Sequence, residues 1–255
     1  MDLVGTGNSR PVRPGRWRDA RLDVTSPSQI RALLERERPQ AVFYCSYDRA
    51  SRAITVEGAA EAARTSSRIG ARFVFVSTDL VFDGRGGSYA ESSPALPVLP
   101  YGRLKLEAES AVRGAAENSV ILRPSLLVGE SGIHLRPAYE CGQLMRGLPA
   151  QLYTDEWRSP VHVDDVARAA WELCCLDVTG VWHTGGPERL SRHQLGQLLC
   201  LLFRFSPALL KPATRPPDRP RDTSLSSARL AMLLGWQARP LASFVAPPSL
   251  EHAGV

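Results

Sequence analysis

Strand and helix signals alternate along the first half of the chain, and this alternation restricts the fold more than any other feature of the sequence. The clearest strand is Arg72 to Ser77, an apolar run rich in β-branched and aromatic residues that follows a Gly-Ala break. Alternating strands and helices are typical of a parallel sheet covered by helices. The sequence therefore predicts an α/β fold with a doubly wound parallel sheet, whose ligands bind beyond the carboxyl ends of the strands.

Apolar periodicity and turn residues predict the other elements. The predicted strands are Asp2–Thr6, Ala41–Cys45, Val120–Leu122, Gln151–Tyr153 and Val181–His183, and the predicted helices are Ser26–Glu37, Ile54–Ile69, Tyr101–Glu117, Tyr139–Arg146, Val163–Leu176, Ser191–Phe205 and Leu225–Leu234. We expect proline-rich Lys211 to Asp222 to be an extended loop, Gly235 to end the last helix, and the tail from Ala246 to be frayed.

Composition argues against several classes of protein. The net charge is +5, but the basic residues are spread along the chain, so a nucleic-acid partner is not favoured. The five cysteines lack metal-ligand spacing, which predicts free thiols and no metal site. The first ten residues lack the apolar core of a signal peptide, and no apolar run is long enough for a membrane span. We therefore expect a cytoplasmic protein without a membrane partner.

The strongest candidate for chemistry is a tyrosine four residues before a lysine, Tyr101 and Lys105, in the helix predicted after the strand ending at Ser77. Residues four apart lie on one face of a helix, so the ammonium can lie near the phenol. A neighbouring positive charge favours the phenolate, which free tyrosine forms only near pH 10. A coincidental pair on a surface helix is the alternative, and the placement of the pair in a helix that follows a strand argues against it.

At these residues the sequence resembles the dTDP-4-dehydrorhamnose reductase family of extended short-chain dehydrogenases/reductases. The segment Ser77-Thr78-Asp79-Leu80-Val81-Phe82-Asp83-Gly84, then Tyr101-Gly102-Arg103-Leu104-Lys105 and Glu107, matches the family signature. Similarity continues through Leu122 to Ser125, Arg158 to Ala167, Gly180 to His183 and Arg219 to Asp222, so it covers nearly the whole chain.

The resemblance implies a Rossmann-like region at residues 1–129 and a mostly C-terminal substrate-binding lobe at residues 130–255. It implies that Tyr101 protonates a ketone oxygen, that Lys105 lowers the pKa of Tyr101 and holds the nicotinamide ribose, and that Thr78 binds the substrate carbonyl. Asp79 and Ser125 are further expected substrate contacts, and Ser77 is an expected cofactor contact. The implied substrate is a nucleotide sugar carrying a ketone, and a homodimer is one assembly compatible with the sequence.

The resemblance fails at the N-terminus, where the family has a strand and a Gly-x-x-Gly-x-x-Gly turn that binds the cofactor pyrophosphate. Gly5-Thr6-Gly7 lacks the third glycine, and Met1 to Arg10 aligns better with the family's second strand. In the family, a further strand lies between the strand that Met1 to Arg10 matches and the strand that Ala41 to Cys45 forms. We therefore expect these two segments to lack that shared partner strand. A wrongly assigned start codon would explain this gap but not a second one, a shortened loop between Cys45 and Val56.

On the adenosine side of the cofactor the resemblance implies two short segments. Asn8, Ser9 and Arg10 would face the ribose, and Asp23 and Val24 would lie beside the adenine. No acidic residue stands at the ribose position, so NADP is expected over NAD.

Two functions follow from the sequence. The first is an NAD(P)H-dependent reductase of a nucleotide-linked 4-keto-6-deoxy sugar, with Tyr101 as general acid. The alternative, favoured by the two gaps, is a non-redox descendant in which cofactor binding has been lost. Such a descendant would be a regulatory subunit, like the methionine adenosyltransferase β subunit that shares this fold, or a cofactor-free acid/base enzyme.

Overall fold

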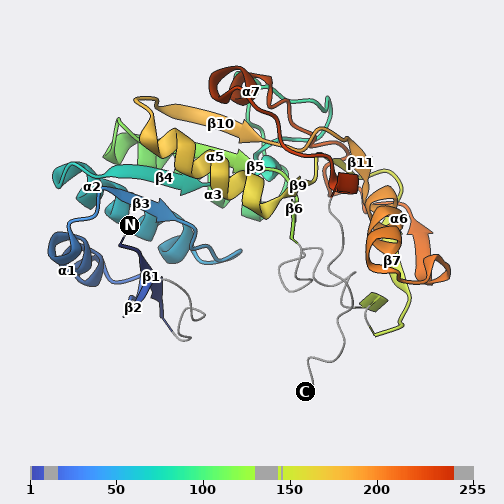
Figure 1. The fold of residues 1–255 in the computed structure, drawn as a ribbon, viewed down its shortest axis with the longest axis horizontal. Helices are drawn as coiled ribbons and strands as arrows, with labels where there is room; N and C mark the ends of the chain where they lie inside the picture. Colours follow the sequence, from blue (N-terminus) through green and yellow to red (C-terminus); the bar gives the residue numbers. More distant parts are fainter. Residues whose placement is uncertain (1, 9–16, 130–142, 145, 244–255) are drawn as a thin grey trace. The chain divides into compact units, whose positions relative to one another are not determined.

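The structure is a computed structural model that describes residues 2–8, 17–129, 143–144 and 146–243 (Figure 1). The chain forms two compact units. The first unit comprises Met1–Ser77, Arg103–Ile121 and Leu173–Gly180, and the second comprises Thr78–Gly102, Leu122–Glu172 and Val181–Val255. These units interleave along the sequence. The division into two functional regions at residue 129 stays a prediction.

From β2 to β5, short strands alternate with longer helices, as predicted for the first half of the chain. The strands are β1 (Val4–Gly7), β2 (Arg18–Arg21), β3 (Ala41–Tyr44), β4 (Arg72–Val76), β5 (Val120–Pro124), β6 (Leu127–Val128), β7 (Ala150–Tyr153), β8 (Trp157–Arg158), β9 (Val161–His162), β10 (Gly180–Thr184), β11 (Leu190–Ser191) and β12 (Leu210–Ala213). The described α-helices are α1 (Pro27–Glu37), α2 (Gly58–Arg68), α3 (Pro100–Ala115), α5 (Val163–Cys175), α6 (Arg192–Phe203) and α7 (Ala228–Leu234).

Four strands form one sheet in the order β10-β5-β4-β3. β3 and β4 run parallel, with Ala41 opposite Arg72 and Tyr44 opposite Phe75. The middle of β4 is buried because strands of a parallel sheet are covered on both faces. These features confirm the predicted α/β fold with a parallel sheet.

β1 and β2 form a separate two-stranded parallel sheet, in which Val4 lies opposite Arg18 and Gly7 opposite Arg21. Within the described residues, β3 is the end strand of the four-stranded sheet and shares no ladder with β1 or β2. The expectation that these two segments lack a shared partner strand is therefore confirmed for this part of the chain.

Helices α1 and α2 pack against each other in the first unit (Figure 1). Ser26 caps α1 by accepting a hydrogen bond from the Gln29 backbone, and Pro27 begins the helix, as its fixed φ allows. The helix predicted from Ile54 begins instead with a π-helical turn, and α2 starts at Gly58. A Cβ at Gly58 would lie 2.5 Å from the Val24 carbonyl oxygen, so this close approach requires glycine.

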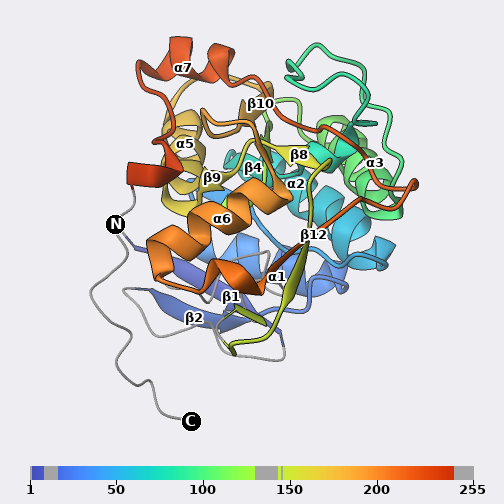
Figure 2. The ribbon, with the colours of Figure 1, turned by 90° about the vertical axis from the view of Figure 1, so that its right-hand side faces the viewer.

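In the second unit, α6 packs against the parallel pair β7 and β12 (Figure 2). Ser191 and Gln194 form a capping box at its start, which confirms the predicted helix. The predicted loop from Lys211 was wrong for Lys211 to Ala213, which belong to β12 and pair with Gln151 to Tyr153. Sequence reasoning missed this strand because proline is rare within sheets, and here it lies on a two-stranded ladder.

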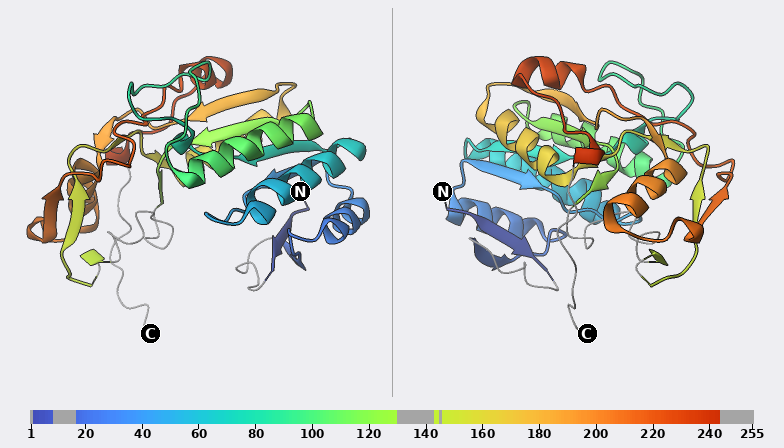
Figure 3. Two further views of the ribbon diagram at one scale, coloured as in Figure 1. Left: turned by 180° about the vertical axis from the view of Figure 1, so that it is seen from behind. Right: turned by 45° about the vertical axis from the view of Figure 1, so that its right-hand side comes forward.

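The last described helix, α7, is the dark red helix of Figure 3 and ends at Gly235, whose φ of 72° confirms it as the stop residue. The predicted start at Leu225 was wrong, since α7 begins at Ala228. Leu225 instead forms a bridge with Tyr89, and its N–H donates to the Ser159 hydroxyl at 3.1 Å. These contacts hold the chain extended up to the start of the helix.

Two predicted features lie largely or wholly outside the described residues: most of the helix Tyr139–Arg146, and the tail from Ala246. Among the helices that are described, none has the length and apolar content needed to cross a membrane.

Candidate active site

Lys105 lies buried on the second turn of α3, with 2% of its surface exposed. Its Nζ donates a hydrogen bond to the Val76 carbonyl oxygen at 2.7 Å, at the carboxyl end of β4. The ammonium also lies 4.5 Å from the centre of the Phe75 ring and 5.6 Å from that of Tyr47. Strand β4 thus fixes the lysine head group at the end of the sheet where ligands are expected.

Burial lowers the pKa of Lys105 to about 8, because the charged form loses its hydration. The Cys45 thiol and the Glu109 carboxylate act in the opposite direction. Glu109 lies one turn further along α3, is buried, and accepts a hydrogen bond from the Ser77 hydroxyl. Ser77, a predicted cofactor contact, therefore has its hydroxyl directed to α3.

Thr78 and Asp79 begin the second unit. The Thr78 hydroxyl accepts a hydrogen bond from the Leu80 backbone at 3.2 Å and donates over 3.3 Å to Asp79. The Asp79 carboxylate is fully buried and receives hydrogen bonds from Ser125 at 2.8 Å and from Arg158. Asp79 and Ser125, both expected substrate contacts, thus bond to each other, and their contact with a substrate stays a prediction.

Gly102 places the start of α3 against the segment that follows Thr78. A Cβ at Gly102 would lie 2.1 Å from the Leu80 carbonyl oxygen and 2.9 Å from Pro97. This contact brings the backbone beside Tyr101, whose side chain is half-buried, against the turn that begins at Thr78. Tyr101 and Lys105 lie one turn apart on α3. That the groups of Thr78, Tyr101 and Lys105 converge on one cleft stays a prediction.

Of the predicted adenosine-side residues, Asp23 and Val24 follow β2. Asp23 accepts hydrogen bonds from the Thr25 hydroxyl at 2.7 Å and the Thr25 backbone at 2.9 Å, and these bonds lower the pKa of its carboxyl group. The Val24 carbonyl approaches Gly58 of α2. Asn8 is exposed after β1. Ser9 and Arg10 lie outside the described residues.

Residues that the sequence analysis did not single out complete a buried ionic network around Asp79. Arg158 pairs with Asp79 and lies 3.9 Å from Glu156, and Arg219 donates to Glu156 at 2.7 Å and 3.0 Å. Burial acts to raise the pKa of Glu156, but the hydrogen bond from Arg219 and the charges of Arg158, Arg219 and Arg192 outweigh it and lower that pKa. A single sequence carries no signal for this pairing across 79 residues. Glu109, four residues after Lys105, was detectable from its helical spacing.

The loop after Thr78 is tied to the rest of the second unit through aromatic and polar contacts. Tyr89 stacks on Phe82 with ring centres 4.2 Å apart and donates to Asp83. Glu91 accepts a hydrogen bond from the His183 backbone at 3.1 Å. Asp83 and Glu91 therefore both bond to groups of their own chain.

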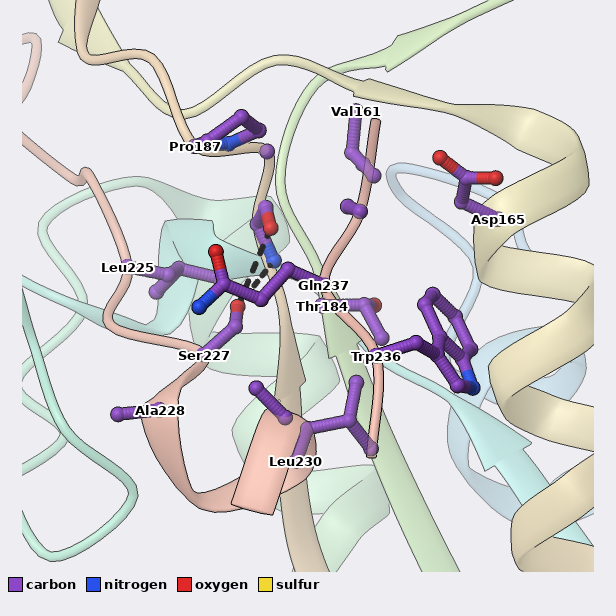
Figure 4. A pocket seen from close by; sticks show the side chains of 14 residues that line it. Val161, Asp165, Thr184, Pro187, Leu225, Ser227, Ala228, Leu230, Trp236 and Gln237 are labelled. Carbon is purple, nitrogen blue, oxygen red and sulfur yellow. Dashed lines mark hydrogen bonds between the residues drawn. The ribbon is translucent and has the colours of Figure 1, made fainter. Parts of the chain in front are cut away.

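A cavity of about 230 Å³ lies elsewhere in the second unit, beside α7 (Figure 4). Its lining combines polar and apolar surface in similar amounts, and Ser227 within it bonds to the Gly185 backbone. Asp165, on its rim in Figure 4, accepts two hydrogen bonds from Arg239. None of the predicted site residues lines this cavity. Across the described ranges, no group of three or more His, Cys, Asp or Glu is placed to hold a metal.

Comparisons with known proteins agree with the family suggested by the sequence. A family model described as the RmlD substrate binding domain matches residues 4–246. Methionine adenosyltransferase 2 subunit beta of Xenopus laevis is 26% identical over 253 residues, covering 89% of this chain and 74% of that protein. The dTDP-4-keto-6-deoxy-D-glucose reductase of Streptomyces niveus is 28% identical over 211 residues, covering 78% and 72%. A dTDP-4-dehydrorhamnose reductase from Bacillus anthracis, crystallised with NADP, has a TM-score of 0.81 at 20% identity, covering 93% and 94%.

Proposed function

Because the chain belongs to the RmlD substrate binding domain family, we propose that it reduces the keto group of a nucleotide-linked 4-keto-6-deoxy sugar with NAD(P)H. The observation that carries this proposal is the pairing of Tyr101 with a buried lysine one turn later on α3. Burying a charged lysine costs free energy, so we expect its charge to have a function. The lysine lies at the carboxyl end of β4, which is where this fold binds ligands.

The nicotinamide half of the cofactor fits the residues present. The Lys105 ammonium carries three N–H donors, and the Val76 carbonyl is its one hydrogen-bond acceptor among the described residues. The remaining N–H groups suit the hydroxyls of a ribose. The bound cofactor would supply the hydride for ketone reduction.

The pyrophosphate half lacks its usual partner in this sequence. Gly5 and Gly7 lie within β1, and the Gly7 carbonyl accepts a hydrogen bond from the Leu22 backbone, so they form a strand rather than a phosphate-binding turn. Within these 255 residues, the contacts proposed for the cofactor therefore lie mainly at its nicotinamide end. NADP remains the expected form, since no acidic residue follows β1 in the predicted ribose position.

Proton transfer would fall to Tyr101, with Lys105 favouring the phenolate and Thr78 binding the ketone oxygen. The bond from Thr78 to Asp79 is long at 3.3 Å, so a substrate carbonyl can replace it. We assign Asp79 and Ser125 to positioning, because the buried carboxylate already binds Ser125 and Arg158 and holds the turn that carries Thr78.

Replacing Tyr101 by phenylalanine tests this function directly. Turnover of a nucleotide-linked 4-keto-6-deoxy sugar at millimolar NADPH should fall by about 10²- to 10⁴-fold, because the change removes only the proton donor. Tyr153→Phe, a tyrosine on β7, is the matched control and should retain the wild-type rate. An unaffected rate in Tyr101→Phe would exclude this residue from the mechanism.

Regulation of another enzyme is the second candidate, and the similarity to methionine adenosyltransferase 2 subunit beta favours it. Such a protein would bind the methionine adenosyltransferase of its own organism and change that enzyme's activity. Co-elution of the two proteins, with an effect on activity that survives Tyr101→Phe, would support regulation over reduction.

A further inference from the structure

Glu109 is a fully buried carboxylate in the first unit with no role in the reaction as described above. Its position on α3, four residues after Lys105, places both side chains on one face of the helix. The Ser77 hydroxyl, at the end of β4, donates a hydrogen bond to its Oε1. Burying a carboxylate costs free energy unless a partner stabilises it, so we expect the buried Glu109 carboxylate to have a function.

The groups that face Lys105 come from three segments. From β4 these are the Val76 carbonyl and the Phe75 ring, and from the end of β3 and the residues after it the Cys45 thiol and the Tyr47 ring. From α3 the facing group is Glu109. Surrounding protein atoms raise the pKa of the Cys45 thiol, although Lys105 opposes this, so the thiol is uncharged at neutral pH.

Glu109 is therefore the source of formal negative charge among these groups. We propose that Glu109 is a positioning residue for the active-site ammonium: its buried carboxylate keeps Lys105 protonated, and Ser77 holds that carboxylate in place. The inference rests on the proposed function for its role in the reaction, but the charge coupling itself exists whether or not the chain is a reductase.

A merely structural Glu109 would act through hydrogen bonds such as the one from Ser77. The amide oxygen of glutamine can do the same with nearly the same shape, so Glu109→Gln removes the charge and keeps the hydrogen bond. A structural role predicts no change at Lys105 in this variant. A charge role predicts that Lys105 loses its proton at lower pH.

The lysine content of the chain makes this measurable without any activity assay. Lys105 and Lys211 are its only lysines, so ¹³C-lysine labelling gives two side-chain signals whose Cε shifts report protonation. Lys211 lies exposed on β12 and serves as the internal reference, and Lys211→Arg assigns the signals. We expect the pH midpoint of the Lys105 titration to fall by roughly one to two pH units in Glu109→Gln. The midpoint of the Lys211 titration should not change.

Two further variants serve as controls for the titration of Glu109→Gln. Glu107→Gln removes an exposed carboxylate of the same helix that pairs with Arg52, and it should leave the Lys105 midpoint unchanged. Ser77→Ala retains the charge but frees the carboxylate, and it should lower the midpoint by a smaller amount. If Glu109→Gln does not fold, as judged by thermal unfolding, an unchanged midpoint in Ser77→Ala overturns the proposal. If it folds, an unchanged midpoint in Glu109→Gln does so.

Enzyme assays then separate the inference from the proposed function. If the chain is a reductase, the alkaline limb of kcat/KM should move to lower pH in Glu109→Gln by the same amount as the Lys105 midpoint. A shifted midpoint in a protein without reductase activity would uphold the charge coupling and reject the proposed function.

Discussion

At the scale of single residues, His183 shows how burial fixes a charge state. It lies fully buried on β10, with its Nδ1 3.1 Å from the Tyr89 carbonyl oxygen and its ring edge-on to Phe82. Burial, aided by the Arg123 charge, lowers its pKa to about 4. The imidazole is therefore neutral at pH 7, and Nδ1 carries the proton that the carbonyl accepts.

This lowered pKa predicts a loss of stability in acid. The unfolded chain takes up a proton near the ordinary pKa of 6.5, whereas the folded chain resists until about pH 4. The free energy of unfolding should thus fall as pH drops from 6.5 to 4, by up to about 3 kcal/mol from this residue. Urea titrations at pH 7, 5 and 4 measure this loss. His183→Gln should show a shallower pH dependence, and parallel curves for the two proteins would contradict the assignment.

Local sequence patterns predicted the site residues that depend on local spacing. Tyr101 and Lys105 could be paired because four residues make one helical turn, and the same rule would have reached Glu109. The Asp79–Arg158 pair was beyond such reasoning, because tertiary folding brings these residues together. The burial of this pair shows that Asp79, although it belongs to the family signature, can have the structural role of holding a turn.

At the scale of elements, α3 contains two glycines in contrasting surroundings. Gly102 faces the Leu80 carbonyl, where a Cβ would lie 2.1 Å away, whereas a Cβ at Gly114 would meet nothing within 4 Å. We therefore expect Gly102→Ala to shift the start of α3 and the Tyr101 beside it. It should lower reductase turnover at least tenfold and reduce stability by about 1–3 kcal/mol.

Gly114→Ala is the matched control on the same helix. Alanine has a higher helix propensity than glycine, so this change should raise the free energy of unfolding by about 0.5–1 kcal/mol without affecting turnover. Thermal unfolding and steady-state assays of both variants decide the matter. Equal behaviour of the two would show that the contact between Gly102 and Leu80 does not position the helix.

Elements with a strong local signal were predicted closely. The strand Arg72 to Val76 contains a continuous apolar run. Ser191 is a helix-capping residue that is followed three positions later by glutamine. The errors arose where tertiary contacts decide, as at Leu225, which is held extended by Ser159, and at Lys211 to Ala213, which pair with β7. Neither partner is visible in the local sequence.

At the scale of the whole molecule, the absence of a glycine-rich turn from the sequence bears on cofactor affinity. Backbone N–H groups at a helix N-terminus orient the pyrophosphate in this fold, and exposed arginines, each contributing about 0–1 kcal/mol, cannot replace them. A protein consisting of these 255 residues should therefore bind NADPH and NADH no more tightly than about millimolar. Calorimetric titration measures this affinity.

A version extended at its N-terminus by a strand and a glycine-rich turn provides the comparison and should bind far more tightly. Micromolar affinity in the 255-residue protein would show that the nicotinamide end alone, through Lys105, suffices to hold the dinucleotide. It would also support the reductase over the regulatory subunit.

Among the described residues, β3 lies at the end of its sheet, and this position affects how a protein of these 255 residues behaves in concentrated solution. The outer edge of a terminal strand presents N–H and C=O groups in the geometry that recruits a strand from another molecule. β3 carries no proline or charged residue, and Phe43 on it is 37% exposed. Molecules crowded together during purification can therefore join edge to edge, so aggregation should increase with concentration.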